Sequence, residues 1–362
     1  MGREELCSNI EQVIAQYSSI GEVVSYGRYG SGHINDTFLL TAKDGTLYIL
    51  QRVNTDIFKN PDGIISNIKL VGEHIVEKYK KDGKNYDRAT LIVIPTDSGE
   101  DQYKDERGGC WRLFHYIYNT VSKDKVSCVE EFRDCARAFG NFLCLLEDFD
   151  ASRLFEVIKD FHNTPKRYEN LMRAVEADVC GRADEVRSEI DFCRVREQFA
   201  STLEVAHKEG RLPLRVTHND TKLNNILFDK DTGETVCVID LDTIMPGYAV
   251  NDFGDSIRFG ASTAAEDEAD LSLVNFDIDL YRAYAEGYLE GAAGKLTDGE
   301  IELLPIGAMM MTFECGMRFL TDYLEGDTYF RTTRPKQNLD RARNQFKLLS
   351  DMESCLDEMR LK

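Results

Sequence analysis

The chain has 362 residues, of which 42% are hydrophobic, and its formal net charge at pH 7 is −20. The length fits two lobes better than one compact core, and the hydrophobic content is that of a packed globular protein rather than a disordered one. A surface this acidic repels nucleic-acid phosphates and anionic lipids, so neither nucleic acid nor a membrane surface is expected as a partner.

Cysteine usage and hydropathy favour a reducing compartment. The ten cysteines are scattered along the chain and form no C-x-x-C pair, which favours core packing over a metal site or a redox pair. Residues 1–17 are charged and lack the apolar core of a signal peptide, and no run of about 18 apolar residues occurs in the chain. We therefore expect a cytoplasmic protein, and we expect it to act as a monomer.

The first third of the chain carries the alternating pattern of strands between two helical stripes. Asp44-Gly45 is typical of a hairpin turn, and Gly30-Ser31-Gly32 separates two of the strands. In chain order, the predicted elements are a helix at 3–19, strands at 22–29, 36–42 and 46–53, a helix at 62–80, and strands at 89–94 and 110–118.

The remainder of the chain is mostly helical in its periodicity, apart from one short β-rich segment at 214–241. The predicted helices are 128–147, 166–178, 184–207, 266–290, 297–325 and 336–359. We therefore predict an α+β fold with a small antiparallel β-rich lobe at 1–115 and a larger helical lobe at 116–362. Ligands commonly bind in the cleft between two such lobes.

One segment has the spacing of a phosphoryl-transfer loop. His218, Asp220 and Asn225 form the pattern H-x-D-x-x-x-x-N, and a following apolar strand ends at Asp240. Asp220 can orient an acceptor hydroxyl and receive its proton, while the Asn225 amide and the Asp240 carboxylate offer the hard oxygen ligands that Mg²⁺ prefers. His218 is expected to stay in the fold and support the loop. Because the strand that ends in carboxylates follows the motif so closely, we prefer this interpretation to ordinary polar residues on a hairpin.

A second carboxylate motif needs a different interpretation. Asp252-Phe253-Gly254 reads as the D-F-G of protein kinases, but it follows the Pro246-Gly247 loop rather than a buried strand. We therefore assign the metal to Asp240, and we expect Asp252 to support the catalytic loop by accepting backbone hydrogen bonds. Asp242 is either a second metal contact or a plain carboxylate at the end of the strand.

The glycine-containing segment between the first two strands is the candidate phosphate loop. Gly30, Ser31 and Gly32 allow backbone amides to approach phosphates closely. The pattern is weak by itself, because Asn35 stands where a dinucleotide fingerprint has its third glycine and a strand follows instead of a helix. A bare hairpin is the alternative. No Walker A motif is present, which argues against a P-loop enzyme.

Kinases usually hold the α- and β-phosphates with a lysine on the third strand, and this strand has none. Gln51 and Arg52 are the candidates, and strand alternation places them on opposite faces. We favour Arg52 for its charge, while the apolar register suits Gln51 equally well. Glu73, on the helix at 62–80, is the expected acidic partner.

Several segments of the chain resemble the aminoglycoside phosphotransferase and choline kinase family, and within it the N-acetylhexosamine 1-kinases. The similarity covers nearly the whole chain and is carried by 30–36 (GSGHIND), 48–54 (YILQRVN), 161–165 (FHNTP), 218–225 (HNDTKLNN), 238–243 (VIDLDT) and 314–330. The resemblance implies a two-lobed protein-kinase-like fold, with a nucleotide-binding N-terminal lobe and a catalytic and acceptor-binding C-terminal lobe.

The resemblance also implies a reaction and further site residues. ATP, with Mg²⁺, would phosphorylate the anomeric hydroxyl of N-acetylglucosamine or N-acetylgalactosamine, and Asp220 would act on that hydroxyl. His33 and Arg318 are candidates for hydrogen bonds to the sugar, although His33 could instead stabilise its loop and Arg318 could pair with Glu314 on a helix face. Tyr116 and Tyr118 lie in the segment whose backbone would meet the adenine edge.

Two alternatives remain open at this point. The acceptor could be choline, ethanolamine, homoserine or an aminoglycoside, and the acidic surface would suit a cationic acceptor. The chain could also be a nucleotide-binding pseudokinase that serves as an interaction module, which the absent strand lysine would favour. The presence of Asp220, Asn225 and Asp240 together argues against the second alternative.

Overall fold

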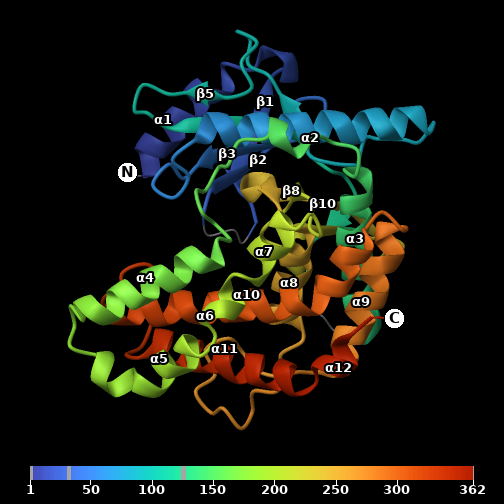
Figure 1. The fold of residues 1–362 in the computed structure, drawn as a ribbon. Coiled ribbons are helices and arrows are strands. Elements are labelled where there is room, and N and C mark those ends of the chain that lie inside the picture. Colours follow the sequence, from blue (N-terminus) through green and yellow to red (C-terminus); the bar gives the residue numbers. More distant parts are fainter. Residues whose placement is uncertain (1–2, 31–33, 124–127, 362) are drawn as a thin grey trace. The chain divides into compact units, whose positions relative to one another are not determined.

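The computed structural model describes residues 3–30, 34–123 and 128–361 (Figure 1). The chain forms two compact units, which we describe separately. Unit 1 comprises Met1–Val121, Asp148–Lys159 and Leu227–Pro246, and unit 2 comprises Ser122–Glu147, Asp160–Ile226 and Gly247–Lys362. The first stretch of unit 1 thus runs a few residues past the predicted division at 115, and that division stays a prediction. The predicted α+β fold class is confirmed, because an antiparallel sheet dominates unit 1 and helices dominate unit 2.

Unit 1 is built on an antiparallel sheet in which the first three strands follow each other along the chain. The Asp44-Gly45 turn forms as predicted, because Gly45 has a φ of 89° and the Asp44 carboxylate accepts the backbone N–H of Thr46. The strand order is β1 (Val23–Arg28), β2 (Asp36–Ala42), β3 (Leu47–Val53), β6 (Cys110–His115) and β4 (Val93–Ile94), and β5 (Tyr103–Lys104) also pairs with β6.

The helices of unit 1 each bury an apolar face. Helix α2 (Pro61–Lys81) begins with Asn60 as its N-cap and Pro61 at its first position, and it buries Ile64, Ile68 and Ile75. The described end of α1 (Arg3–Ile14) buries Ile10 and Val13 against the sheet core around Leu40. A second, smaller sheet has the strand order β10 (Thr235–Val238), β9 (Ile226–Asp229) and β7 (Thr120–Val121).

Unit 2 contains short strand β8 (Arg215–Thr217) and most of the helices. They are α3 (Val129–Leu145), α4 (Thr164–Ala177), α5 (Arg187–Arg194), α6 (Glu197–Ala200), α7 (Thr202–Lys208), α8 (Ala249–Gly260), α9 (Ile278–Ala292), α10 (Asp298–Leu324), α11 (Gln337–Ser354) and α12 (Leu356–Met359). Strand β11 (Met245–Gly247) links the two units along the chain.

The structure corrects two of the predicted helices and adds one that was not predicted. The region 184–207 is not one helix but contains three short ones, α5, α6 and α7. The helix predicted at 266–290 begins only at Ile278, because the Asp277 carboxylate caps it by accepting the backbone N–H groups of Asp279 and Leu280. Helix α8 was missed, because the preceding Pro246-Gly247 suggested a continuing loop.

Close packing of two helices fixes the position of α8. A Cβ atom on Gly254 of α8 would lie 2.3 Å from the Gly307 carbonyl of α10, and one on Gly307 would lie 2.2 Å from the Val250 carbonyl. Only glycine allows this approach, so α8 rests directly on α10. By length and composition α10 could cross a membrane, but 83% of its most apolar stretch is buried inside the protein, as in a core helix.

Candidate active site

The candidate catalytic loop is tied to the start of α8. The Asp252 carboxylate accepts the backbone N–H groups of His218 and Asn219, each at 2.7 Å. The Thr221 hydroxyl donates to the Asp252 carbonyl at 2.7 Å, and the Ser256 hydroxyl donates to the Thr221 carbonyl at 2.8 Å. Burial raises the pKa of the Asp252 carboxyl, while His218 and the two backbone donors act in the opposite direction. The loop conformation therefore depends on one buried carboxylate.

His218 lies in the hydrophobic interior rather than on the open side of the loop. Its side chain is fully buried, and its ring meets the edges of Phe139 and Phe142 of α3 at centroid distances of 5.7 and 6.1 Å. Its Nδ1 accepts the backbone N–H of Asp220 at 3.3 Å. These contacts position the Asp220 backbone from inside the fold.

Asp220 lies between an ammonium and an amide. The Lys222 Nζ is 2.5 Å from Asp220 Oδ1, and Asn225 Nδ2 donates to the carbonyl and Oδ2 of Asp220 at 2.8 and 3.1 Å. Burial opposes the charge on Lys222, but the pair with Asp220 outweighs it and raises the lysine pKa. The Asp220 side chain is 29% exposed, so a ligand can reach it. Lys222 belongs to this group although the motif spacing gives it no role.

The residues proposed for Mg²⁺ offer suitable oxygens. Asn225 uses its Nδ2 for Asp220, and no hydrogen bond from the described part of the chain engages its Oδ1. Asp240 follows β10 in a left-handed conformation, with φ 59° and ψ 56°, which aspartate tolerates better than most residues. No group of three or more His, Cys, Asp or Glu side chains that could hold a metal occurs among the described residues. Each of the two residues thus carries an oxygen of the kind that Mg²⁺ binds.

The described end of the glycine-containing loop is anchored to the segment after Asp240. Gly30 has a φ of 77°, and Ser31, Gly32 and His33 lie outside the described residues. Asn35 Nδ2 donates to Asp242 Oδ2 at 2.6 Å, and its Oδ1 accepts the backbone N–H of Asn54 at 3.0 Å. Asn35 therefore links the loop end, the end of β3 and the carboxylate segment within unit 1.

The two candidates on β3 have different surroundings. Gln51 donates to Thr37 at 3.1 Å, and its Oε1 accepts Nη2 of Arg112 at 2.8 Å. The Arg52 guanidinium lies instead 6.0 Å from the ring centre of Trp111. The expected acidic partner, Glu73, is an exposed residue of α2.

Arg112 is a residue that the sequence analysis missed. Its Nη2 lies 2.6 Å from Asp242 Oδ1, and the two side chains are only 2% and 4% exposed. Both carboxylate oxygens of Asp242 are thus engaged by nitrogen donors, Arg112 and Asn35. The available signal was a lone charged residue inside the buried apolar strand CWRLFH.

Tyr116 and Tyr118 belong to a group of tyrosines beside the sheet. Their rings meet edge to face at 5.2 Å, and the Tyr116 hydroxyl lies 3.2 Å from that of Tyr29. The Tyr118 hydroxyl accepts the backbone N–H of Leu47 at 2.5 Å. These contacts fix the segment that follows β6, where the adenine was expected.

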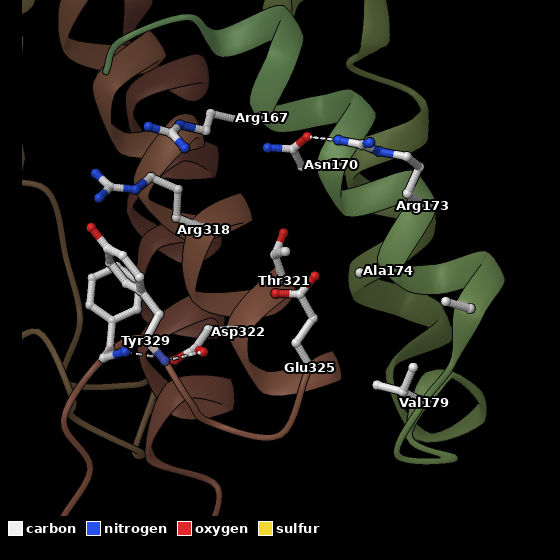
Figure 2. Close-up of a pocket in the computed structure, with 12 residues that line it drawn as sticks. Arg167, Asn170, Arg173, Ala174, Val179, Arg318, Thr321, Asp322, Glu325 and Tyr329 are labelled. Atoms are coloured by element: carbon white, nitrogen blue, oxygen red, sulfur yellow. Dashed lines mark hydrogen bonds between the residues drawn. The ribbon is translucent and has the colours of Figure 1, made fainter. Parts of the chain in front are cut away.

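Unit 2 contains a hollow between α4 and α10, with a volume of about 510 Å³ (Figure 2). Arg167 and Arg318 approach each other at one end of it, and Tyr329 lies beside Arg318. The Arg318 guanidinium carbon is 5.7, 6.0 and 5.5 Å from the ring centres of Phe161, Tyr329 and Phe330. The structure thus surrounds this guanidinium with aromatic faces.

Neither arginine at this end of the hollow has a carboxylate partner in the described part of the chain. Arg167 donates to the Phe161 carbonyl at 2.8 Å, and burial together with the charge of Arg318 lowers the pKa of Arg167. The Arg318–Glu314 pair considered above does not form: Glu314 instead accepts His162 at 3.0 Å and Thr164 at 2.7 Å. We call Arg167, Arg318 and His162 the arginine pocket. Sequence patterns did not indicate Arg167 or His162, because α4 and the segment before it meet α10 only through tertiary packing.

Comparison with known proteins agrees with this fold. A model of the phosphotransferase enzyme family matches residues 89–292, more than half of the chain and a range that includes both Asp220 and Asp252. Three solved structures superpose over nearly their whole length. An aminoglycoside phosphotransferase from Alicyclobacillus acidocaldarius has a TM-score of 0.60 at 12% identity and covers 96% of each chain. A microcompartment-associated aminopropanol kinase has a TM-score of 0.55 at 14% identity, covering 98% of this chain and 99% of its own. A choline kinase from Streptococcus pneumoniae has a TM-score of 0.51 at 15% identity, covering 94% and 99%.

Proposed function

We propose that this chain, which belongs to the phosphotransferase enzyme family, transfers the γ-phosphoryl group of ATP to the anomeric hydroxyl of an N-acetylhexosamine. The products would be the sugar 1-phosphate and ADP. The observation that carries the proposal is the catalytic loop, which α8 and His218 hold so that a partly exposed Asp220 lies beside Lys222 and Asn225. Phosphoryl transfer depends mainly on such positioning and on charge stabilisation.

The proposed chemistry assigns a role to each group of this loop. Asp220 accepts a hydrogen bond from the acceptor hydroxyl and takes its proton as the oxygen attacks phosphorus. Lys222 places a positive charge next to that carboxylate and can stabilise negative charge on the transferred group. Asn225 and Asp240 would hold Mg²⁺, which neutralises charge on the phosphate oxygens when it is bound. His218 and Asp252 keep the loop in place and do not touch the substrate.

The nucleotide would be bound by residues of unit 1. Gly30, Ser31 and Gly32 are proposed to cradle the phosphates with their backbone amides. The backbone near Tyr116 and Tyr118 is proposed to meet the adenine edge. Gln51 and Arg52 both remain candidates for the phosphate contact of β3.

The arginine pocket supports a neutral, hydroxyl-rich acceptor. The Arg318 guanidinium has no ion pair with a described residue, and its planar fork suits paired sugar oxygens. His33, outside the described residues, is the second proposed sugar contact. A cationic acceptor such as choline or an aminoglycoside would be repelled by Arg167 and Arg318, and the aromatic faces that could bind its ammonium already surround Arg318. This local charge outweighs the acidic net charge, which had favoured a cationic acceptor.

An acceptor screen tests the proposal directly. ADP release would be followed with ATP and Mg²⁺ over N-acetylglucosamine, N-acetylgalactosamine, glucose, choline, homoserine and kanamycin, with phosphorus NMR of any product. We expect turnover of the N-acetylhexosamines and a 1-phosphate signal. Turnover of an amino alcohol or aminoglycoside alone would overturn the acceptor, and nucleotide binding without turnover of any acceptor would favour the pseudokinase. Sedimentation and cell fractionation test the accompanying proposals that the protein is monomeric and cytoplasmic.

A further inference from the structure

Arg112 is a buried cation in the middle of β6. Its side chain is 2% exposed, and its neighbours along the strand, Trp111 and Leu113, are fully buried. An arginine side chain rarely lies so deep unless its charge is paired and its donors are used, because leaving water is unfavourable for a charged group.

Two of its three nitrogen atoms are engaged within unit 1. Nε and Nη2 donate to Gln51 Oε1 at 3.1 and 2.8 Å, and Nη2 also donates to Asp242 Oδ1 at 2.6 Å. The third nitrogen, Nη1, is buried and has no hydrogen-bond partner among the residues that the structure describes. A buried donor without an acceptor is unusual in a folded protein, so Nη1 is available to an acceptor atom that a ligand would bring.

Arg112 lies beside one of the two residues of β3 that are candidates for the phosphate contact. β3 pairs with β6 so that Gln51 lies opposite Arg112, and directly paired residues share one face of a sheet. Arg112 therefore shares a face of the sheet with Gln51, whereas Arg52 lies over Trp111. Asn35, at the end of the glycine-containing loop, donates to the same Asp242 that pairs with Arg112.

We propose that Arg112 supplies the cation that this chain lacks on β3, with Nη1 donating to a phosphate oxygen of the bound nucleotide. The inference rests on the proposed function only in requiring that a nucleotide binds to unit 1. In protein kinases one lysine pairs with a carboxylate and also contacts the phosphates. A guanidinium can do both at once because its donors point in fixed, different directions. The ion pair with Asp242 then orients the Arg112 guanidinium, and the nucleotide must displace the side-chain atoms that cover Nη1.

Calorimetric titration of the whole chain tests this inference without any acceptor. MgATP, MgADP and adenosine are titrated into the wild type, Arg112→Met and the double variant Arg112→Met/Asp242→Asn. The double variant removes both charges of the pair and so avoids an uncompensated buried carboxylate. Lys69→Met is the matched control, because it also removes a paired cation from unit 1, the partner of Asp101 at 2.8 Å.

We expect both Arg112 variants to bind MgATP and MgADP about 10- to 100-fold more weakly, the range for one lost charge-assisted hydrogen bond. Adenosine, which has no phosphate, should bind them within twofold of the wild type, and Lys69→Met should bind all three ligands normally. If Arg112→Met fails to fold, Arg112→Lys, which keeps the charge but loses the fork, is expected to show the same selective loss on a smaller scale.

Three results would overturn the inference. One is a folded double variant that binds MgADP as tightly as the wild type, since Arg112 would then only balance Asp242. Another is an equal loss of affinity for adenosine and MgADP, and the third is a wild type that binds none of the three ligands. A wild type that binds MgATP but phosphorylates no hexosamine would remove the acceptor assignment and leave the role of Arg112 intact.

Discussion

The catalytic loop and the arginine pocket, both in unit 2, differ in how completely their polar groups are paired. In the loop, Asp252 accepts two backbone N–H groups and His218 accepts a third. In the pocket, Arg318 lies against aromatic rings and forms no hydrogen bond or ion pair with a described residue, and the buried His162 Nε2 has no hydrogen-bond partner among those residues. Paired groups hold a conformation, whereas unpaired donors are available to a ligand. Substitutions in the loop should therefore change catalysis or stability, and substitutions in the pocket should change acceptor affinity.

The largest expected effect is on turnover in Asp220→Asn. The amide keeps the size of the side chain but cannot accept the acceptor proton, so we expect kcat to fall by about 10²- to 10⁴-fold. The variant should fold normally, because the Asp220 side chain is partly exposed. Steady-state kinetics and circular dichroism check this. Asp191→Asn, at an exposed carboxylate paired with Arg194 in the same unit, is the control and should keep its activity. Near-wild-type turnover of Asp220→Asn would remove Asp220 as the base.

A loss of stability is the next largest effect, in Asp252→Ala. This change leaves two buried backbone donors, those of His218 and Asn219, without their acceptor. Each buried donor left unsatisfied costs about 1–3 kcal/mol, so the free energy of unfolding should fall by about 3 kcal/mol. Urea unfolding measures it, with Asp279→Ala at an exposed position of α9 as control. A loss below about 1 kcal/mol would mean that the loop is held by other contacts.

Arg318→Met should weaken acceptor binding and little else. Arg318 forms no ion pair with a described residue, so stability should stay close to that of the wild type, while the KM for the acceptor should rise about tenfold through loss of a charged donor. The KM for ATP should not change. Steady-state kinetics at varied acceptor concentration and at varied ATP concentration measure the two KM values separately. Arg194→Met, which breaks an exposed ion pair on α5, is the control. An equal rise in both KM values would contradict an acceptor role for Arg318.

The sequence predicted contiguous features better than those that depend on packing. His218, Asp220 and Asn225 lie within one short segment, so their spacing alone indicates a phosphoryl-transfer loop. Asp252 could be assigned to supporting that loop, because it does not follow a buried strand as a metal-binding aspartate would. Arg112 could not be found in this way, since its partners come from distant segments: Gln51 meets it through the register of β3 with β6, and Asp242 meets it through tertiary packing.

The choice between competing partners was equally hidden from the sequence. Helical spacing permits a pair between Glu314 and Arg318, but Glu314 bonds to His162 and Thr164 because α4 packs against α10. Neighbouring residues determine a local sequence pattern, whereas the tertiary structure determines which of several possible hydrogen-bond partners a side chain takes.

The smallest expected effect is a pH dependence of stability that arises from Glu314. Burial alone would raise the pKa of this fully buried carboxyl, but His162, Arg318 and Thr164 outweigh it and lower the pKa below the ordinary value of 4.5. A carboxyl with a lowered folded-state pKa stabilises the fold above its unfolded pKa. That stabilisation is lost as the pH falls below 4.5 and through the folded-state pKa.

Glu314→Gln isolates this contribution, because glutamine keeps the shape and removes the titration. The Tm of the variant should lie below that of the wild type at pH 7, and the difference should shrink as the pH falls below 4.5. Thermal unfolding at several pH values measures it, with Glu302→Gln at an exposed position of α10 as the control that shows no such trend. A Tm difference that stays constant through the acidic range would mean that the Glu314 carboxyl does not carry its charge in the folded protein.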